Sequence, residues 1–91
     1  ILKSYANAGE TGNFYYYRDK DANEIDLIIK RDEILHPIEF KKAATLNKND
    51  VKSFSKLSQF QQTIGTGALV SLYPEVTYVK EGVQTIPAWT L

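Results

Sequence analysis

Two neighbouring segments separated by a short polar stretch constrain the fold of this chain most. Residues 24–30 read EIDLIIK and residues 34–41 read ILHPIEFK. Polar and apolar side chains alternate in both segments, and a period of two is typical of β-strands that bury one face. The sequence therefore predicts a β-hairpin with a two-residue turn at Asp32 and Glu33. One face of this hairpin is expected to be apolar apart from a histidine, with Ile25, Leu27, Ile29, Ile34, His36, Ile38 and Phe40.

The other face of the hairpin gathers charged side chains at one end. With the turn at residues 32–33, Asp26 lies opposite Glu39 and Glu24 lies opposite Lys41. A slip of one residue would place these charges opposite apolar side chains, so the alternation favours this register. Two carboxylates that face each other repel, and one of them tends to take up a proton. A divalent cation between Asp26 and Glu39 would remove the repulsion, and Lys41 beside it would stabilise negative charge on a phosphate.

Similar patterns predict the other elements of the chain. They are the end of a helix at 1–8, a strand at 14–18, a turn at 19–23, a helix from Asn47 to about residue 62, a strand at 68–73 and a hairpin of 76–79 with 83–86. Asn47 is the expected N-cap of the second helix, with Asp50 in a place resembling a capping box. Its apolar face is expected to hold Val51, Phe54 and Leu57. Pro37 predicts an edge position or a bulge in its strand, because proline cannot donate to a ladder.

The composition narrows the class of protein. A length of 91 residues indicates one small domain, and 11 basic residues balance 11 acidic ones, so the net charge gives no argument for nucleic acid. The absence of cysteine and the single histidine exclude thiolate and histidine-rich metal sites, which leaves an ion held by oxygen atoms. No apolar run approaches the roughly 18 residues of a membrane span, so we expect a cytoplasmic protein that does not enter a membrane. The lack of methionine predicts a domain cut from a longer chain.

Three short stretches of the sequence resemble those of a known protein family. They are residues 15–19 (YYYRD), 23–27 (NEIDL) and 37–43 (PIEFKKA). An acid on one strand, Glu39-Phe40-Lys41 on the next and then a helix resemble the PD-(D/E)xK nuclease superfamily, which includes restriction endonucleases and archaeal Holliday-junction resolvases. The stretches look most like the uncharacterised domain that follows the ATPase module in many bacterial and archaeal P-loop (AAA-type) proteins. The resemblance covers residues 1–91, with its specific part in 14–58.

The resemblance implies a fold and a setting. The expected fold is α/β with a mixed sheet, a restriction-endonuclease-like α-β-β-β-α-β core followed by a C-terminal β-hairpin. Residues 1–91 would form a single nuclease-like domain, the C-terminal fragment of a larger ATPase. The expected partners are DNA, the ATPase portion of the same chain and a second copy in a homo-oligomer. The chain has no G-x-x-x-x-G-K-[ST] pattern, so we expect no ATP site in it.

The resemblance also implies roles for individual residues. Asp26 and Glu39 would bind Mg²⁺ or Mn²⁺ together with the Phe40 carbonyl, and Lys41 would orient or activate the attacking water. Glu24 would be an outer-shell acid, and Glu10 a further acid from the first helix. In this chain Ile25 stands before Asp26, where the superfamily often has proline.

Each of these features also has a purely structural explanation. In that explanation Glu24 and Lys41 form a cross-strand ion pair, and Asp26 and Glu39 are solvated surface acids. The lysines that could bind phosphate, Lys42, Lys48, Lys52 and Lys56, include three that fit a solvated helix face. Tyr15, Tyr16 and Tyr17 would stack bases or pack the core, and His36 would be a base or a half-buried side chain. Trp89 is expected to anchor the last strand.

Two functions follow from these alternatives. The first is a divalent-metal-dependent DNA nuclease-like domain that hydrolyses phosphodiesters as part of a P-loop ATPase, which would make it a magnesium-dependent endonuclease. The alternative is a non-catalytic protein-interaction or DNA-binding module that keeps the nuclease fold.

Overall fold

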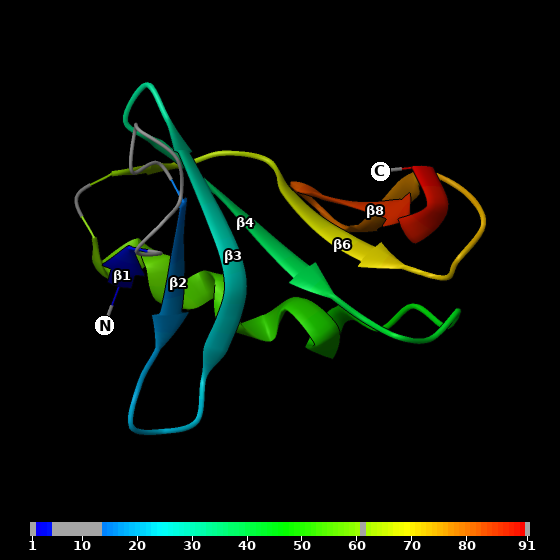
Figure 1. The fold of residues 1–91 in the computed structure, drawn as a ribbon, viewed down its shortest axis with the longest axis horizontal. Helices are drawn as coiled ribbons and strands as arrows, with labels where there is room; N and C mark the ends of the chain where they lie inside the picture. Colours follow the sequence, from blue (N-terminus) through cyan, green and yellow to red (C-terminus); the bar gives the residue numbers. More distant parts are fainter. Residues whose placement is uncertain (1, 5–13, 61, 91) are drawn as a thin grey trace.

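The computed structural model describes residues 2–4, 14–60 and 62–90, and it has a mixed α+β architecture (Figure 1). One eight-stranded sheet contains strands in the order β1-β2-β3-β4-β6-β8-β7, and β5 pairs with β4 beside this path. The strands are β1 (Leu2–Ser4), β2 (Phe14–Arg18), β3 (Glu24–Arg31), β4 (Ile34–Phe40), β5 (Thr63–Ile64), β6 (Gly67–Ser71), β7 (Thr77–Lys80) and β8 (Val83–Pro87). Two 3₁₀ helices, η1 (Lys48–Gln59) and η2 (Ala88–Thr90), complete the described elements.

The sheet joins an antiparallel half to a parallel half. Strands β1 to β4 form an antiparallel meander. The chain then passes through η1 and returns as β6, which is parallel to β4, and β8 is parallel to β6. Strand β7 closes the far edge as the antiparallel partner of β8, which confirms the predicted hairpin. Figure 1 shows the arrowheads of β4, β6 and β8 pointing the same way, so their carboxyl ends share one edge of the sheet.

The register of the β3–β4 hairpin is the predicted one. Leu27 pairs with Ile38 and Arg31 pairs with Ile34, which leaves Asp32 and Glu33 as a two-residue turn. Both turn residues have positive φ, 54° and 65°. Two successive positive φ angles are the signature of a type I′ turn, whose twist matches that of the flanking strands.

A β-bulge in β3 changes which face is buried. Tyr15 pairs with Ile28 and Tyr17 pairs with Ile25, so two steps along β2 correspond to three steps along β3. The extra residue lets Ile25 and Ile28 face the same side, and both are buried. The predicted apolar face was therefore wrong in part, because an inserted residue shifts the alternation. In β4 the fully buried side chains come from the face that was expected to carry the charges, namely Leu35 and Pro37.

Helix η1 covers one face of the sheet and closes the core. Figure 1 shows it crossing behind β2 and β3. Its buried side chains are the three predicted ones, Val51, Phe54 and Leu57. They pack in one cluster with Tyr17, Ile25, Ile28, Leu35, Leu69 and Val83. None of the helices among the described residues has the length and apolar character needed to cross a membrane.

The predicted N-cap of η1 is confirmed, and the end of the helix differs from the prediction. The side chain of Asn47 accepts a hydrogen bond from the Asn49 amide at 2.9 Å. The helix is kinked at Val51, whose φ and ψ are −120° and 19°. It ends at Gln59 instead of about residue 62, because Phe60 adopts an extended conformation.

Two further expectations are corrected. Residues 2–4 form strand β1 instead of a helix, with Leu2 paired to Tyr17. The free edge of β2 offers hydrogen bonds to a strand, and this outweighs the helical spacing of a few apolar residues. The remaining residues of that predicted helix lie outside the described part of the chain.

Pro37 does not lie on an edge strand, since β4 stands between β3 and β6. The neighbouring ladder is interrupted at this point instead. Leu35 pairs with Ile64 of β5, and the next pair on that side is Ile38 with Ala68 of β6. Pro37, which has no N–H to donate, thus lies opposite the gap between β5 and β6, where no strand is paired with β4 on that side.

Candidate metal centre

Two carboxylates face each other across the open end of the β3–β4 hairpin. The amide of Asp26 donates to Glu39 Oε1 at 3.2 Å. The amide of Phe40 donates to Asp26 Oδ2, also at 3.2 Å. Each side chain is therefore fixed by the backbone of the other strand. The predicted juxtaposition of Asp26 and Glu39 is present in the structure, and the bulge in β3 lies beside it.

The environment of Glu39 favours its protonated form. Burial raises the pKa of this carboxyl to about 7, and the negative charges of Asp26 and Glu24 act in the same direction. The hydrogen bond from the Asp26 amide opposes the rise without cancelling it. Burial is the main cause of this rise, and repulsion between the facing carboxylates adds to it.

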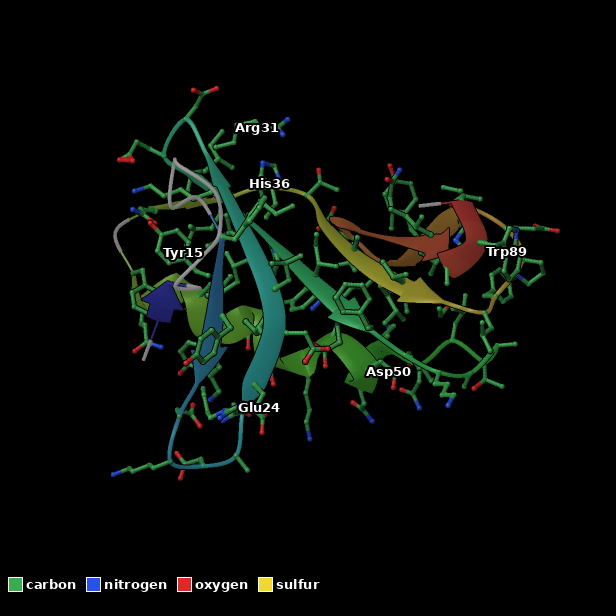
Figure 2. All side chains as sticks on the ribbon, viewed as in Figure 1. Tyr15, Glu24, Arg31, His36, Asp50 and Trp89 are labelled. Atoms are coloured by element: carbon green, nitrogen blue, oxygen red, sulfur yellow. The ribbon has the colours of Figure 1, made fainter. Side chains whose placement is uncertain are left out.

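Lys41 binds an acid that the hairpin does not contain. Its Nζ lies 2.5 Å from Asp50 Oδ2, and the two side chains are 21% and 25% exposed. Its amide donates to the Val70 carbonyl at 2.8 Å, which ties the end of β4 to β6. Figure 2 labels Asp50 beneath the end of β4, on the side of η1.

The expected ion pair between Glu24 and Lys41 is not the one that forms. Strand β4 ends at Phe40, and Lys41 turns toward η1. Glu24 lies 3.7 Å from the Arg18 guanidinium instead. Sequence reasoning missed Asp50 as part of this region, because its position three residues after Asn47 suggested a capping box. The available signal was an acid in the first turn of the helix that directly follows the strand with Lys41.

The other lysines of the sequence pattern are exposed. Lys48, Lys52 and Lys56 lie on η1, and Lys42 follows the end of β4.

The aromatic residues of β2 serve mainly the core. Tyr17 is buried, donates its hydroxyl hydrogen to Asp19 at 2.8 Å and accepts from Gln59 at 3.1 Å. Tyr15 packs against the core, and Tyr16 lies 5.7 Å from the Arg18 guanidinium. The structural explanation is therefore confirmed for Tyr15 and Tyr17.

His36 and Trp89 differ in how far they are buried. His36 is half-buried, and its Nδ1 lies 3.0 Å from the Thr66 carbonyl oxygen. Trp89 was expected to anchor the last strand, and this was wrong, because it is largely exposed at the end of β8 (Figure 2). Glu10 lies outside the described residues.

The chemistry of the acid pair fits a hard divalent cation. Magnesium commonly takes one or two carboxylates from the protein and fills its other positions with water and phosphate oxygens. Asp26 and Glu39 supply such a pair, and the Phe40 carbonyl stays a predicted third ligand. Among the described residues, no group of three or more histidine, cysteine, aspartate or glutamate side chains is arranged to hold a metal. A cation here would therefore keep several positions open.

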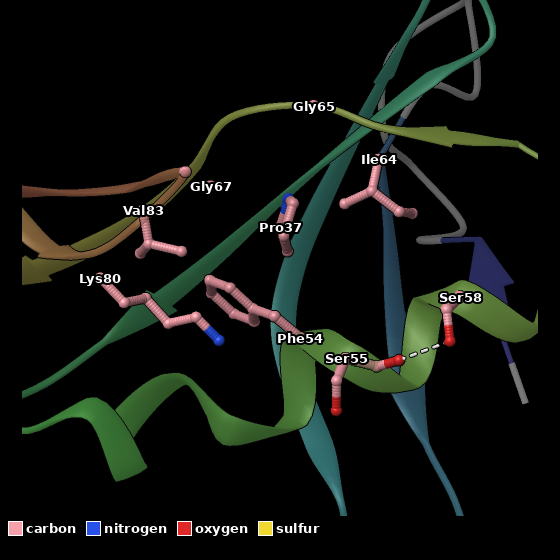
Figure 3. A pocket seen from close by; sticks show the side chains of 10 residues that line it. Pro37, Phe54, Ser55, Ser58, Ile64, Gly65, Gly67, Lys80 and Val83 are labelled. Atoms are coloured by element: carbon pink, nitrogen blue, oxygen red, sulfur yellow. Dashed lines mark hydrogen bonds between the residues drawn. The ribbon is translucent and has the colours of Figure 1, made fainter.

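A separate hollow lies on the η1 side of the sheet, at the break between β5 and β6 (Figure 3). It has a volume of about 210 Å³, and Pro37, Phe54, Ile64 and Val83 form its apolar wall. Figure 3 shows Lys80 at its mouth, and no carboxylate lines it. Asp26 and Glu39 are not among the residues that line this hollow.

Comparisons with known proteins give one finding about the family. No curated protein matches the chain, and no solved structure matches it. A family profile described as a domain of unknown function, DUF4143, matches residues 1–91, and the chain therefore belongs to the DUF4143 family.

Proposed function

We propose that this domain binds Mg²⁺ or Mn²⁺ at Asp26 and Glu39 and acts as a nuclease-like domain of the PD-(D/E)xK type on DNA. The observation that carries the proposal is the pair of carboxylates, each bonded to the backbone of the opposite strand. A fixed pair of this kind costs electrostatic energy without a cation. The raised pKa of Glu39, caused by burial and by the charge of Asp26, supports the proposal, because functional carboxylates are often perturbed in this way.

The topology supports the same proposal. The three antiparallel strands β2, β3 and β4, the crossover through η1 and the parallel strand β6 follow the last five elements of the α-β-β-β-α-β core that the sequence resemblance implies, whereas residues 2–4 form strand β1 in place of its first helix. The same resemblance proposes that the domain works beside a P-loop ATPase module in the cytoplasm.

In this proposal the acid pair holds the cation and Lys41 binds the substrate phosphate. A bound cation would activate water and neutralise charge on the phosphate. Asp26 and Glu39 would hold the cation, and Glu39 would release its proton on binding. Lys41 would exchange the Asp50 carboxylate for a phosphate oxygen of the substrate, so Asp50 would keep its ammonium group near the site until DNA arrives.

The test is Mn²⁺ binding by calorimetry at about pH 8, where Glu39 is ionised. We expect the wild type to bind, and Glu39→Gln to lose at least about ten-fold in affinity. Glu81→Gln removes an exposed acid from the β7–β8 turn and serves as the matched control, with unchanged affinity. Absence of binding in the wild type would reject the metal site and favour the alternative, a non-catalytic module that keeps this fold.

A further inference from the structure

A second hollow opens at the edge where the parallel strands end. It has a volume of about 300 Å³. Its lining comes from the ends of β4, β6 and β8, with Phe40, Lys41, Lys42, Val70, Leu72 and Ala88. In open sheets with parallel strands, ligands bind in the crevice outside the carboxyl ends of the strands. This hollow occupies that position.

The hollow is lined by apolar side chains, and the charged residues that line it are both lysines. Phe40 is 49% exposed and Leu72 is 45% exposed, which are high values for large apolar side chains in a folded domain. The exposed Lys42 lines the same hollow, as does Lys41, whose ammonium group is paired with Asp50, and no acidic side chain lines it. An aromatic ring beside lysines is the combination that binds single-stranded nucleic acid, in which bases stack on rings and phosphates lie near cations.

The hollow adjoins the acid pair through one residue. Phe40 provides a wall of the hollow, and its amide donates to the Asp26 carboxylate. Phe40 therefore connects the hollow to the acid pair through its own backbone. Tyr15 and Tyr17 of β2 are not available for stacking, because they pack in or against the core.

Building on the proposed function, we infer that the hollow at the end of β4 is a stacking site for one unpaired base of single-stranded DNA. A duplex keeps its bases stacked on one another, so it cannot offer a base to a hollow of this kind without extruding it. The domain is then expected to prefer single strands, gaps or flaps over intact duplex.

The experiment measures binding of a fluorescein-labelled oligothymidylate by anisotropy, in EDTA and at low salt. Chelation separates this test from metal binding. We expect Phe40→Leu, which keeps an apolar side chain but removes the ring, to weaken binding about 5- to 100-fold. Phe40→Trp should retain or increase the affinity. Tyr78→Leu is the matched control, because Tyr78 is 63% exposed on β7 and lies outside the hollow.

A photo-crosslink locates the base directly. An oligothymidylate that contains one 5-iodouracil should crosslink to the peptide that contains Phe40, and unlabelled duplex should compete poorly. The inference is overturned if the wild type fails to bind the oligonucleotide, if Phe40→Leu and Phe40→Trp bind equally well, or if the crosslink maps elsewhere. Loss of manganese binding in Glu39→Gln with oligothymidylate binding intact would support the stacking site independently of the metal.

Discussion

Glu39 has a strongly raised pKa. Its pKa is raised to about 7 from an ordinary value of 4.5, chiefly by burial. The folded chain therefore holds this proton more tightly than the unfolded chain does. The stability that the proton contributes is fully present below pH 4.5 and is lost as the pH rises through about 7.

A neutral isostere at this position should remove that pH dependence. We expect Glu39→Gln to match the wild type at about pH 4.5 and to exceed it at about pH 8, by on the order of 1 kcal/mol in the free energy of unfolding after allowance for solvent screening. Urea denaturation across this pH range, without divalent metal, measures the difference. Stability curves that run parallel at every pH would contradict the assignment, and Glu81→Gln should follow the wild type.

The sequence was a good guide to some residues of the site and a poor guide to others. The facing of Asp26 and Glu39 could be predicted, because a two-residue turn fixes the pairing of the hairpin as far as Leu27 and Ile38, the neighbours of the two acids. The bond between Lys41 and Asp50 could not, since it depends on the direction in which η1 leaves the sheet. The exposure of Phe40 was equally hidden, because it depends on strands that arrive later in the chain.

At the scale of an element, the β3–β4 turn places two residues with a Cβ in the left-handed backbone region, where glycine or asparagine would be less strained. Asp32 and Glu33 have φ of 54° and 65°, a conformation that costs residues with a Cβ about 1–2 kcal/mol each. Glu33 recovers little of this through its exposed ion pair with Lys30 at 3.1 Å.

The pair Asn-Gly is the preferred solution for a type I′ turn. We expect the double variant Asp32→Asn, Glu33→Gly to raise the free energy of unfolding by about 1 kcal/mol. Thermal and urea denaturation measure the gain. Glu33→Gln breaks the ion pair without relieving the backbone, so it should be neutral or slightly destabilising, and a gain in this control would refute the explanation.

The bulge in β3 shows why the buried face could not be predicted from alternation. One extra residue between Ile25 and Ile28 reverses the pattern for the rest of the strand, although the sequence of the strand reads as a regular alternation followed by an apolar run. Strand β1 was missed for a different reason, because its conformation depends on the free edge of β2.

At the scale of the whole molecule, one helix covers the sheet in the described part of the chain. Leu57 of η1 is fully buried among residues of β2, β3, β4, β6 and β8. The crossover that brings η1 across this face was expected from the resemblance, whereas the local pattern indicated only a helix followed by a strand.

Removing the Leu57 side chain should therefore weaken the entire fold at once. We expect Leu57→Ala to lower the free energy of unfolding by about 2–5 kcal/mol, as a transfer loss plus a cavity. Lys52→Ala on the exposed side of the same helix is the matched control and should stay within about 0.5 kcal/mol of the wild type. Urea unfolding measures both, and a small loss at Leu57 would mean that η1 does not hold the sheet together.

The parallel strands β4, β6 and β8 end at one edge, and this has a consequence for which sequence changes the domain can accept. The segments that follow β6 and β8 are a loop and the short helix η2, and neither contributes a residue to the buried cluster. Insertions and exchanges there leave the core intact, as surface connections generally tolerate them. Substitutions in the loop of residues 72–76 can thus change the surface of this edge while the core, the β3–β4 hairpin and the acid pair stay as they are.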